Sequence, residues 1–338
     1  MKGLPRFIWM LPLLMIGALP ASADLLVVLN KSDNKAALID PNQRHKVVAR
    51  LKTGKAPHEV AVTPDGHWAF VSNYGMSGVF NGKKKDEPGN TITVLDLERR
   101  KVARTITLPA AARPHGIATS RDGALVWVTC EGEKAVLELD ANSGNVLHTW
   151  PTGQETSHMV VSSPDEKKLY VANIGSGSVT TIDRQSNAVN SVPTGDGAEG
   201  IDVSPDGREV WVADRGADEI AVLDAASGSV VARFKSGGVM PIRVKFTPDG
   251  RLAFVSNGKT NRVVVFDTTT RQAVKTIAVG TMPVGIQMEP TGTRAYVANT
   301  NDNTVCVIDI PTRTVMTILN TGKEPDGMAW ALTKSGKR

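Results

Sequence analysis

The sequence predicts an all-β fold, a seven-bladed β-propeller of four-stranded antiparallel blades, on three observations. One segment recurs six times at spacings of 41 to 43 residues, with one longer spacing of 57 residues between His58 and His115. Each copy is followed by two further apolar runs separated by polar turns. Long helical patterns are missing after residue 23, which argues against an α/β fold. Self-similarity at this period is typical of propellers and solenoids.

Each repeat is expected to form four short strands. The six copies of its first half span Pro57–Asn73, Pro114–Cys130, Ser157–Asn173, Ala198–Asp214, Pro241–Asn257 and Pro283–Asn299. Within a copy, two apolar runs flank a turn such as Thr63–Gly66, in which Pro presets the turn and Gly takes the positive φ. A third run ends in Asp, as at Val179–Asp183, and a fourth leads to Gly, as at Val274–Gly280. Alternating β-branched and aromatic residues favour strands in all four.

The two ends of the chain together supply the seventh blade. Leu25–Asn30, Lys35–Asp40 and Val47–Gly54 have the patterns of a second, third and fourth strand, with no first strand before them. Pro325–Trp330 has the pattern of a first strand with nothing after it. Joining these ends in one blade closes the ring and leaves no radial strand edge unpaired. We therefore expect one domain over residues 24–338.

The second strands carry a repeated signature, written here as Phe-Val-Ser-Asn (70–73), Trp-Val-Thr-Cys (127–130), Tyr-Val-Ala-Asn (170–173) and Trp-Val-Ala-Asp (211–214). This signature resembles the YVTN-family repeats of YncE-like β-propeller proteins, over residues 25 to 330. The resemblance implies the propeller fold and membership in a group of exported bacterial proteins. It does not by itself imply an activity, because one fold serves many functions.

Residues 1–23 have the pattern of a cleaved export signal. Lys2 and Arg6 precede an apolar stretch, and Ala21-Ser22-Ala23 fits a cleavage site. We expect a periplasmic or secreted monomer with no membrane span after cleavage. The formal charge of +5 falls to about +3 without the signal, which argues against nucleic acid as the partner. No Cys-x-x-Cys-His motif is present, so covalent haem is not expected.

One repeat position concentrates the residues that could do chemistry. The residue that opens the first strand is His58, His115, His158, Glu199, Ile242, Val284 and Asp326 in blade order, and Arg243 follows directly in the fifth blade. Since the first strand is innermost in a propeller, these side chains should surround one mouth of the channel. Pairing across the turn is expected to set His58 beside Asn73 and His115 beside Cys130. A small molecule or a periplasmic protein is the expected partner, bound by His58, His115, His158, Glu199, Arg243 and Asp326.

Imidazoles and carboxylates in a ring suit a transition-metal site or acid–base chemistry. His58, His115 and His158 are the candidate ligands of a divalent metal, and the alternative is a polar channel rim. The inserted segment Gly75–Gly89 accounts for the long spacing and should lie on the same face, either as a binding loop or as a tolerated insertion.

Three functions are compatible with this pattern. Our main expectation is a non-enzymatic binding or scaffold propeller that uses the face with the histidines and residues 75–89. The alternative is a metal-dependent hydrolase with lactonase-like activity at the channel mouth. A DNA-binding propeller is the third hypothesis, which the modest charge does not favour.

Overall fold

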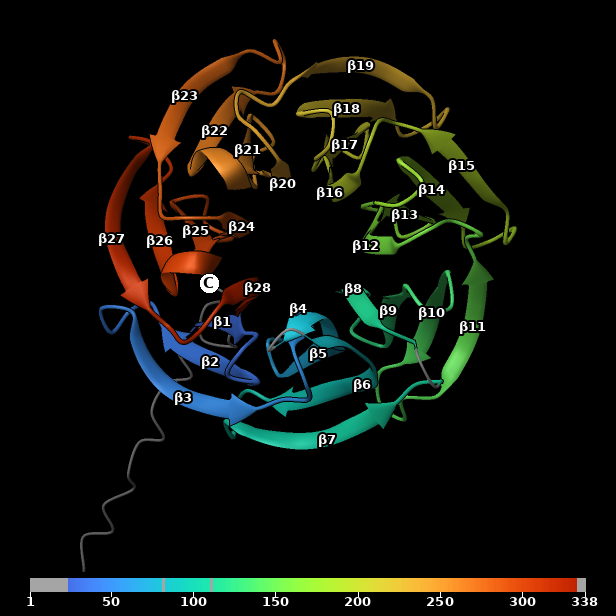
Figure 1. Ribbon diagram of the computed structural model, residues 1–338, viewed down its shortest axis with the longest axis vertical. Coiled ribbons are helices and arrows are strands. Elements are labelled where there is room, and N and C mark those ends of the chain that lie inside the picture. The colour runs from blue at the N-terminus through green and yellow to red at the C-terminus, as the bar shows by residue number, and fades with distance from the viewer. Residues whose placement is uncertain (1–23, 81–82, 110–111, 333–338) are drawn as a thin grey trace, which may run out of the picture.

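A computed structural model describes residues 24–80, 83–109 and 112–332 of the chain. Its strands form seven four-stranded antiparallel sheets arranged as blades around a central channel (Figure 1). The predicted seven-bladed propeller is confirmed. The proposed export signal lies outside the described residues. No helix in the described ranges is long and apolar enough to span a membrane.

Six blades are continuous in sequence, and we number them from the first complete one. Blade 1 contains β4 (Pro57–Val62), β5 (Trp68–Phe80), β6 (Lys83–Asp96) and β7 (Lys101–Thr107). Blade 2 contains β8 (Pro114–Thr119), β9 (Leu125–Cys130), β10 (Ala135–Asp140) and β11 (Val146–Pro151). Blade 3 contains β12 (Ser157–Ser162), β13 (Lys168–Asn173), β14 (Ser178–Asp183) and β15 (Val189–Pro193).

The second half of the ring repeats this order. Blade 4 contains β16 (Ala198–Val203), β17 (Glu209–Asp214), β18 (Glu219–Asp224) and β19 (Val230–Lys235). Blade 5 contains β20 (Pro241–Phe246), β21 (Leu252–Asn257), β22 (Arg262–Asp267) and β23 (Ala273–Ala278), with the 3₁₀ turn η1 (Gly258–Thr260). Blade 6 contains β24 (Pro283–Met288), β25 (Arg294–Asn299), β26 (Thr304–Asp309) and β27 (Thr314–Asn320), with η2 (Thr300–Asp302).

Blade 7 is closed by both ends of the chain, as the sequence predicts. It consists of β28 (Pro325–Ala331) paired with β1 (Leu25–Asn30), followed by β2 (Lys35–Asp40) and β3 (Lys46–Lys52). The pairing is antiparallel, with Leu26 opposite Trp330 and Val28 opposite Met328. This closure leaves each blade packed between two neighbours.

Most of the hydrophobic core lies between neighbouring blades. One cluster joins Phe70 and Ile92 of blade 1 to Val126 and Val128 of blade 2. The repeated aromatic position of the second strands is almost fully buried throughout: Phe70, Trp127, Tyr170, Trp211, Phe254 and Tyr296. Burial of each such side chain contributes about 1.5–3 kcal/mol, which explains why the signature recurs in these blades.

Repeated turns connect the first and second strands. At the first copy, the Thr63 hydroxyl donates to Asp65 over 2.6 Å and the Gly66 N–H donates to the Thr63 carbonyl over 2.8 Å. Gly66 has a φ of +74°, in the left-handed region that glycine adopts without strain. The turns thus hold the innermost strands in the same orientation around the channel.

Candidate functional site at the channel mouth

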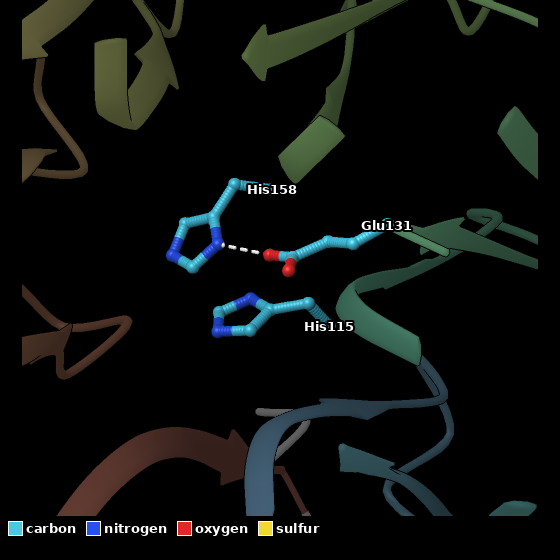
Figure 2. A group of neighbouring side chains, drawn as sticks. All are labelled: His115, Glu131 and His158. Carbon is cyan, nitrogen blue, oxygen red and sulfur yellow. Dashed lines mark hydrogen bonds and ion pairs between the residues drawn. The ribbon is translucent and has the colours of Figure 1, made fainter. Parts of the chain in front are cut away.

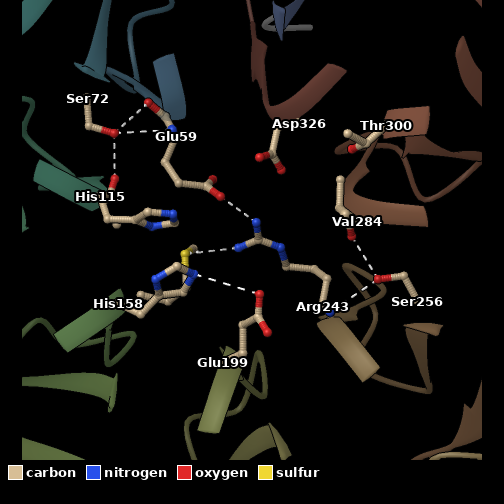
Figure 3. Close-up of polar contacts among 12 residues, drawn as sticks. Glu59, Ser72, His115, His158, Glu199, Arg243, Ser256, Val284, Thr300 and Asp326 are labelled. Carbon is tan, nitrogen blue, oxygen red and sulfur yellow. Dashed lines mark hydrogen bonds and ion pairs between the residues drawn. The ribbon is translucent and has the colours of Figure 1, made fainter. Parts of the chain in front are cut away.

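The six residues predicted to bind a ligand lie around one cavity of about 300 Å³. Each comes from the first strand of a different blade: His58, His115, His158, Glu199, Arg243 and Asp326. Five of these side chains converge on the channel in Figure 3, and His58 lines the same cavity. Their equivalence in the repeat therefore corresponds to proximity in space.

A β-bulge in the first strand places two consecutive residues at the channel. Pro57 pairs with Asn73 and Val60 pairs with Val71, so three steps along β4 match two along β5. The expected register, with His58 beside Asn73, is therefore wrong by one residue, and blade 2 shows the same shift. As a result both His58 and Glu59 line the cavity.

Hydroxyl groups of the second strand support this bulge. The Ser256 hydroxyl accepts the Arg243 N–H at 3.1 Å and donates to the Val284 carbonyl of the next blade at 2.7 Å. The Thr129 hydroxyl likewise accepts the Gly116 N–H at 2.8 Å and donates to the His158 carbonyl of the next blade at 2.6 Å. These hydroxyls replace the ladder hydrogen bonds that the bulge removes, and they fix the spacing between neighbouring first strands.

The ring of His115 contacts the rings of both other histidines. His115 stacks on His158 with ring centroids 3.5 Å apart, and His58 lies 5.0 Å from His115. Burial lowers the pKa of His58 to about 4 and that of His115 well below its usual value, so both rings are neutral near pH 7. The Nδ1 atom of His58 hydrogen-bonds the Ala56 carbonyl at 2.8 Å. Among the described residues, the buried Nδ1 atom of His115 has no hydrogen-bond partner.

Glu131 completes the histidine cluster, and the sequence argument did not include it. Its carboxylate accepts a 2.6 Å hydrogen bond from His158 Nδ1 (Figure 2). It accepts another of 2.6 Å from the Tyr74 hydroxyl. Burial raises the pKa of Tyr74 to about 12, so its hydroxyl keeps its proton. Glu131 and Tyr74 each follow directly after the four-residue signature of a second strand. That repeat position, which also holds Lys31 and Arg215, was the signal that could have identified them.

Ion pairs neutralise most of the charge around the cavity. Arg243 of blade 5 pairs with Glu59 of blade 1, and both side chains are buried (Figure 3). Lys31 contacts Asp326 at 2.9 Å, and Arg215 contacts Glu199 at 2.9 Å. Burial by itself lowers the pKa of Arg243, but the negative charges of Glu59, Asp326 and Glu199 together outweigh it, so the pKa is raised and the guanidinium stays protonated.

The wall from blades 5 and 6 is different in character. Apart from Arg243, its lining side chains are apolar: Met240, Ile242, Met282 and Val284. Blades 1 to 4 and blade 7 instead contribute the histidines and carboxylates. Such a cavity suits an organic molecule with one polar and one apolar side.

Where the structure describes it, the inserted segment Gly75–Gly89 continues the pairing of β5 with β6 on the same face as the histidines. It prolongs β5 and β6 beyond the blade, with Gly75 paired to Pro88 and Met76 paired to Glu87. A second cavity of about 500 Å³ is lined by Gly75 and Met76 and shares Lys31, His58 and Tyr74 with the channel cavity. Lys55, which also lines this cavity, contacts Glu87 of the inserted segment at 2.6 Å.

Fold and site together define a seven-bladed propeller with a buried polar cluster at one channel mouth. The model of the family described as "Lactonase, 7-bladed beta-propeller" matches residues 28–278, more than half of the chain. The chain belongs to this family. No curated protein matches it significantly.

Solved structures show the same fold at low sequence identity. The Pseudomonas aeruginosa periplasmic gluconolactonase PpgL is 20% identical, with 92% of this chain and 100% of that chain covered and a TM-score of 0.71. Kuenenia stuttgartiensis hydrazine synthase is 22% identical, with 84% of this chain and 92% of that chain covered and a TM-score of 0.73. The dihydro-heme d1 dehydrogenase NirN is 19% identical, with 90% of this chain and 66% of that chain covered and a TM-score of 0.65.

The family match corrects the functional expectation from sequence. A non-enzymatic binding or scaffold role was the main expectation, and it is wrong because the chain belongs to a lactonase family. The repeat pattern identified the propeller but did not distinguish among its uses. The sequence alternative, a lactonase-like enzyme, agrees with the family instead.

Proposed function

We propose that this protein is a hydrolase that opens a lactone, a cyclic ester, at the channel mouth. The observation that carries the proposal is the hydrogen bond between Glu131 and His158 at the edge of the cavity, in a propeller of the lactonase family. The YVTN-type signature supports a finer proposal, that within this family the protein is related to the YncE-like propellers. The pattern of residues 1–23 supports export of the protein. The modest net charge supports a small molecule rather than nucleic acid as the partner.

His158 is suited to activate a water molecule. An ionised carboxylate only accepts hydrogen bonds, so Glu131 places the proton of His158 on Nδ1 and leaves the Nε2 lone pair free. That nitrogen lies 3.9 Å from Glu199, on the side of the cavity. The Nε2 atom takes a proton from the water as its oxygen attacks the lactone carbonyl carbon.

The remaining steps return this proton to the substrate. Attack produces a tetrahedral intermediate whose oxygen carries a negative charge. Arg243, whose guanidinium lies in the centre of the group in Figure 3, supplies the positive charge that stabilises this oxygen. The ring C–O bond then breaks, His158 donates its proton to the departing alkoxide, and the product is an open-chain hydroxy acid.

A pH-stat assay with purified protein tests the proposal. Sugar lactones and alkyl-substituted lactones should release acid faster than in buffer alone. His158→Ala should lower the rate by about 10²–10⁴-fold, because it removes the general base. His148→Ala, on the outer strand β11, is the matched control and should retain the rate. If no lactone is hydrolysed above the buffer rate, or if His158→Ala is fully active, the proposal is wrong.

A further inference from the structure

Three side chains at the channel mouth form a group with the spacing of metal ligands. Ligand atoms of His115, Glu131 and His158 all lie within 4.8 Å of one another (Figure 2). They come from β8, from the residue after β9, and from β12. Two of these ligands, His115 and His158, were candidates from the sequence. Glu131 takes the place of His58 as the third ligand.

An unpartnered buried atom points independently to a ligand. His115 is 5% exposed, and its Nδ1 atom has no hydrogen-bond partner in the described part of the chain. A buried polar atom without a partner costs about 1–3 kcal/mol, so it needs a physical explanation. A neutral imidazole with an unused ring nitrogen is the form in which histidine binds a metal.

The surroundings orient the other two ligands. The Tyr74 hydroxyl holds one oxygen of Glu131 at 2.6 Å and thereby fixes the direction of the carboxylate. The Thr129 hydroxyl holds the backbone of His158 through its carbonyl at 2.6 Å. His58 is not among the ligand atoms that lie within 4.8 Å of one another, and its Nδ1 atom is bonded to the Ala56 carbonyl at 2.8 Å.

We propose that His115, Glu131 and His158 bind one divalent transition-metal ion of the zinc or cobalt type. Two imidazoles and one carboxylate suit these ions, whereas calcium and magnesium prefer oxygen ligands alone. Bonds of about 2.0–2.2 Å require small rotations that bring the ligand atoms closer than they are now. The ion replaces the proton that joins His158 to Glu131, and the cavity leaves room for a further ligand on its open side.

The role of such an ion rests on the proposed function, but its binding does not. If the protein hydrolyses lactones, the ion takes over water activation from the imidazole because it lowers the pKa of a bound water. The experiment therefore measures binding itself.

Metal-free full-length protein is titrated with Zn²⁺ by calorimetry and with Co²⁺ by visible absorption. We expect one ion per chain, bound with micromolar or tighter affinity, and cobalt bands typical of four or five coordination. His115→Ala and Glu131→Gln should weaken binding at least 100-fold. His58→Ala is the matched control from the same ring and should stay within about threefold of the unaltered protein. Circular dichroism verifies folding, and His115→Gln replaces His115→Ala if the latter does not fold.

Either of two results overturns the inference: no stoichiometric binding, or binding that depends on His58 as strongly as on His115 and Glu131. Lactone hydrolysis without ion binding would overturn the metal site and leave the proposed function intact. Ion binding without hydrolysis of any lactone would uphold the metal site and contradict the proposed function.

Discussion

Glu59 and Arg243, which are 184 residues apart in sequence, form a buried ion pair across the channel (Figure 3). Each follows a ring position directly, and each reaches the channel because of the bulge in its first strand. The pair links blade 1 to blade 5 without any backbone pairing between these blades.

Removing one partner of this pair should be strongly destabilising. Arg243→Leu leaves the carboxylate of Glu59 buried and unpaired, and we expect a loss of about 3–5 kcal/mol in the free energy of unfolding. The double variant Glu59→Leu/Arg243→Leu should regain most of this loss, because no lone charge remains. Urea unfolding gives the measurement. Lys235→Ala, which breaks an exposed 2.9 Å pair with Glu219, is the control and should cost less than about 1 kcal/mol. Single and double variants of equal stability would contradict the explanation.

Tyr74 is expected to position Glu131 without reacting itself. Tyr74→Phe leaves one carboxylate oxygen of Glu131 without its 2.6 Å hydrogen bond. In the lactone assay, kcat should fall about tenfold with KM nearly unchanged, which corresponds to about 1.4 kcal/mol in the transition state. Tyr170→Phe also removes a tyrosine hydroxyl, one that donates to the Ala225 carbonyl at 3.3 Å away from the cavity, and should leave kcat unchanged. A rise in KM alone, or equal effects of both variants, would show that Tyr74 has a different role.

Asp214 should make the stability of the protein depend on pH. Burial raises its pKa to about 7, one oxygen accepts from Thr194 at 3.0 Å, and the other has no hydrogen-bond partner among the described residues. The folded state therefore holds a proton that the unfolded chain has lost, so this residue lowers stability as pH rises from about 4 to about 7. Asp214→Asn should gain roughly 2 kcal/mol over the unaltered protein at pH 8 and less at pH 5.

The other blades provide a matched test of this effect. Asn257 occupies the same position in blade 5 and is also fully buried. Asn257→Asp should introduce a second, similar loss of stability between pH 4 and pH 7. Unfolding by urea across this range measures both variants. Parallel pH profiles for Asp214→Asn and the unaltered protein would disprove the assignment.

Closure of the ring should depend on β28. A chain that ends at Gly322 lacks this strand, so the fully buried strand β1 becomes an exposed edge. We expect aggregation or the loss of a single cooperative thermal transition. A chain that ends at Leu332 keeps β28 and is the matched control. The shorter chain would have to melt like the control, with equal cooperativity, to contradict this prediction.

Much of the architecture was accessible from local sequence. The Pro-Asp-Gly turns, the Phe-Val-Ser-Asn signature and the Asp at the end of each third strand are local signals, and their repetition determines the number of blades. Incomplete repeats at both ends predicted that Leu25–Asn30 and Pro325–Trp330 lie in one blade, and the structure pairs Leu26 with Trp330. The histidines of the ring were found because equivalent residues of a symmetric repeat face the same axis.

Tertiary structure alone decided which of these residues meet. The bulge shifted the register by one residue and brought Glu59 to the channel, where it pairs with Arg243 rather than with a neighbour in sequence. Glu131 contacts His158 of the next blade because the packing between blades sets that distance. Sequence located the repeat position that opens onto the channel, since strand alternation and repeat register are local. Their pairing across the channel depends on the spacing of whole blades, which local pattern does not contain.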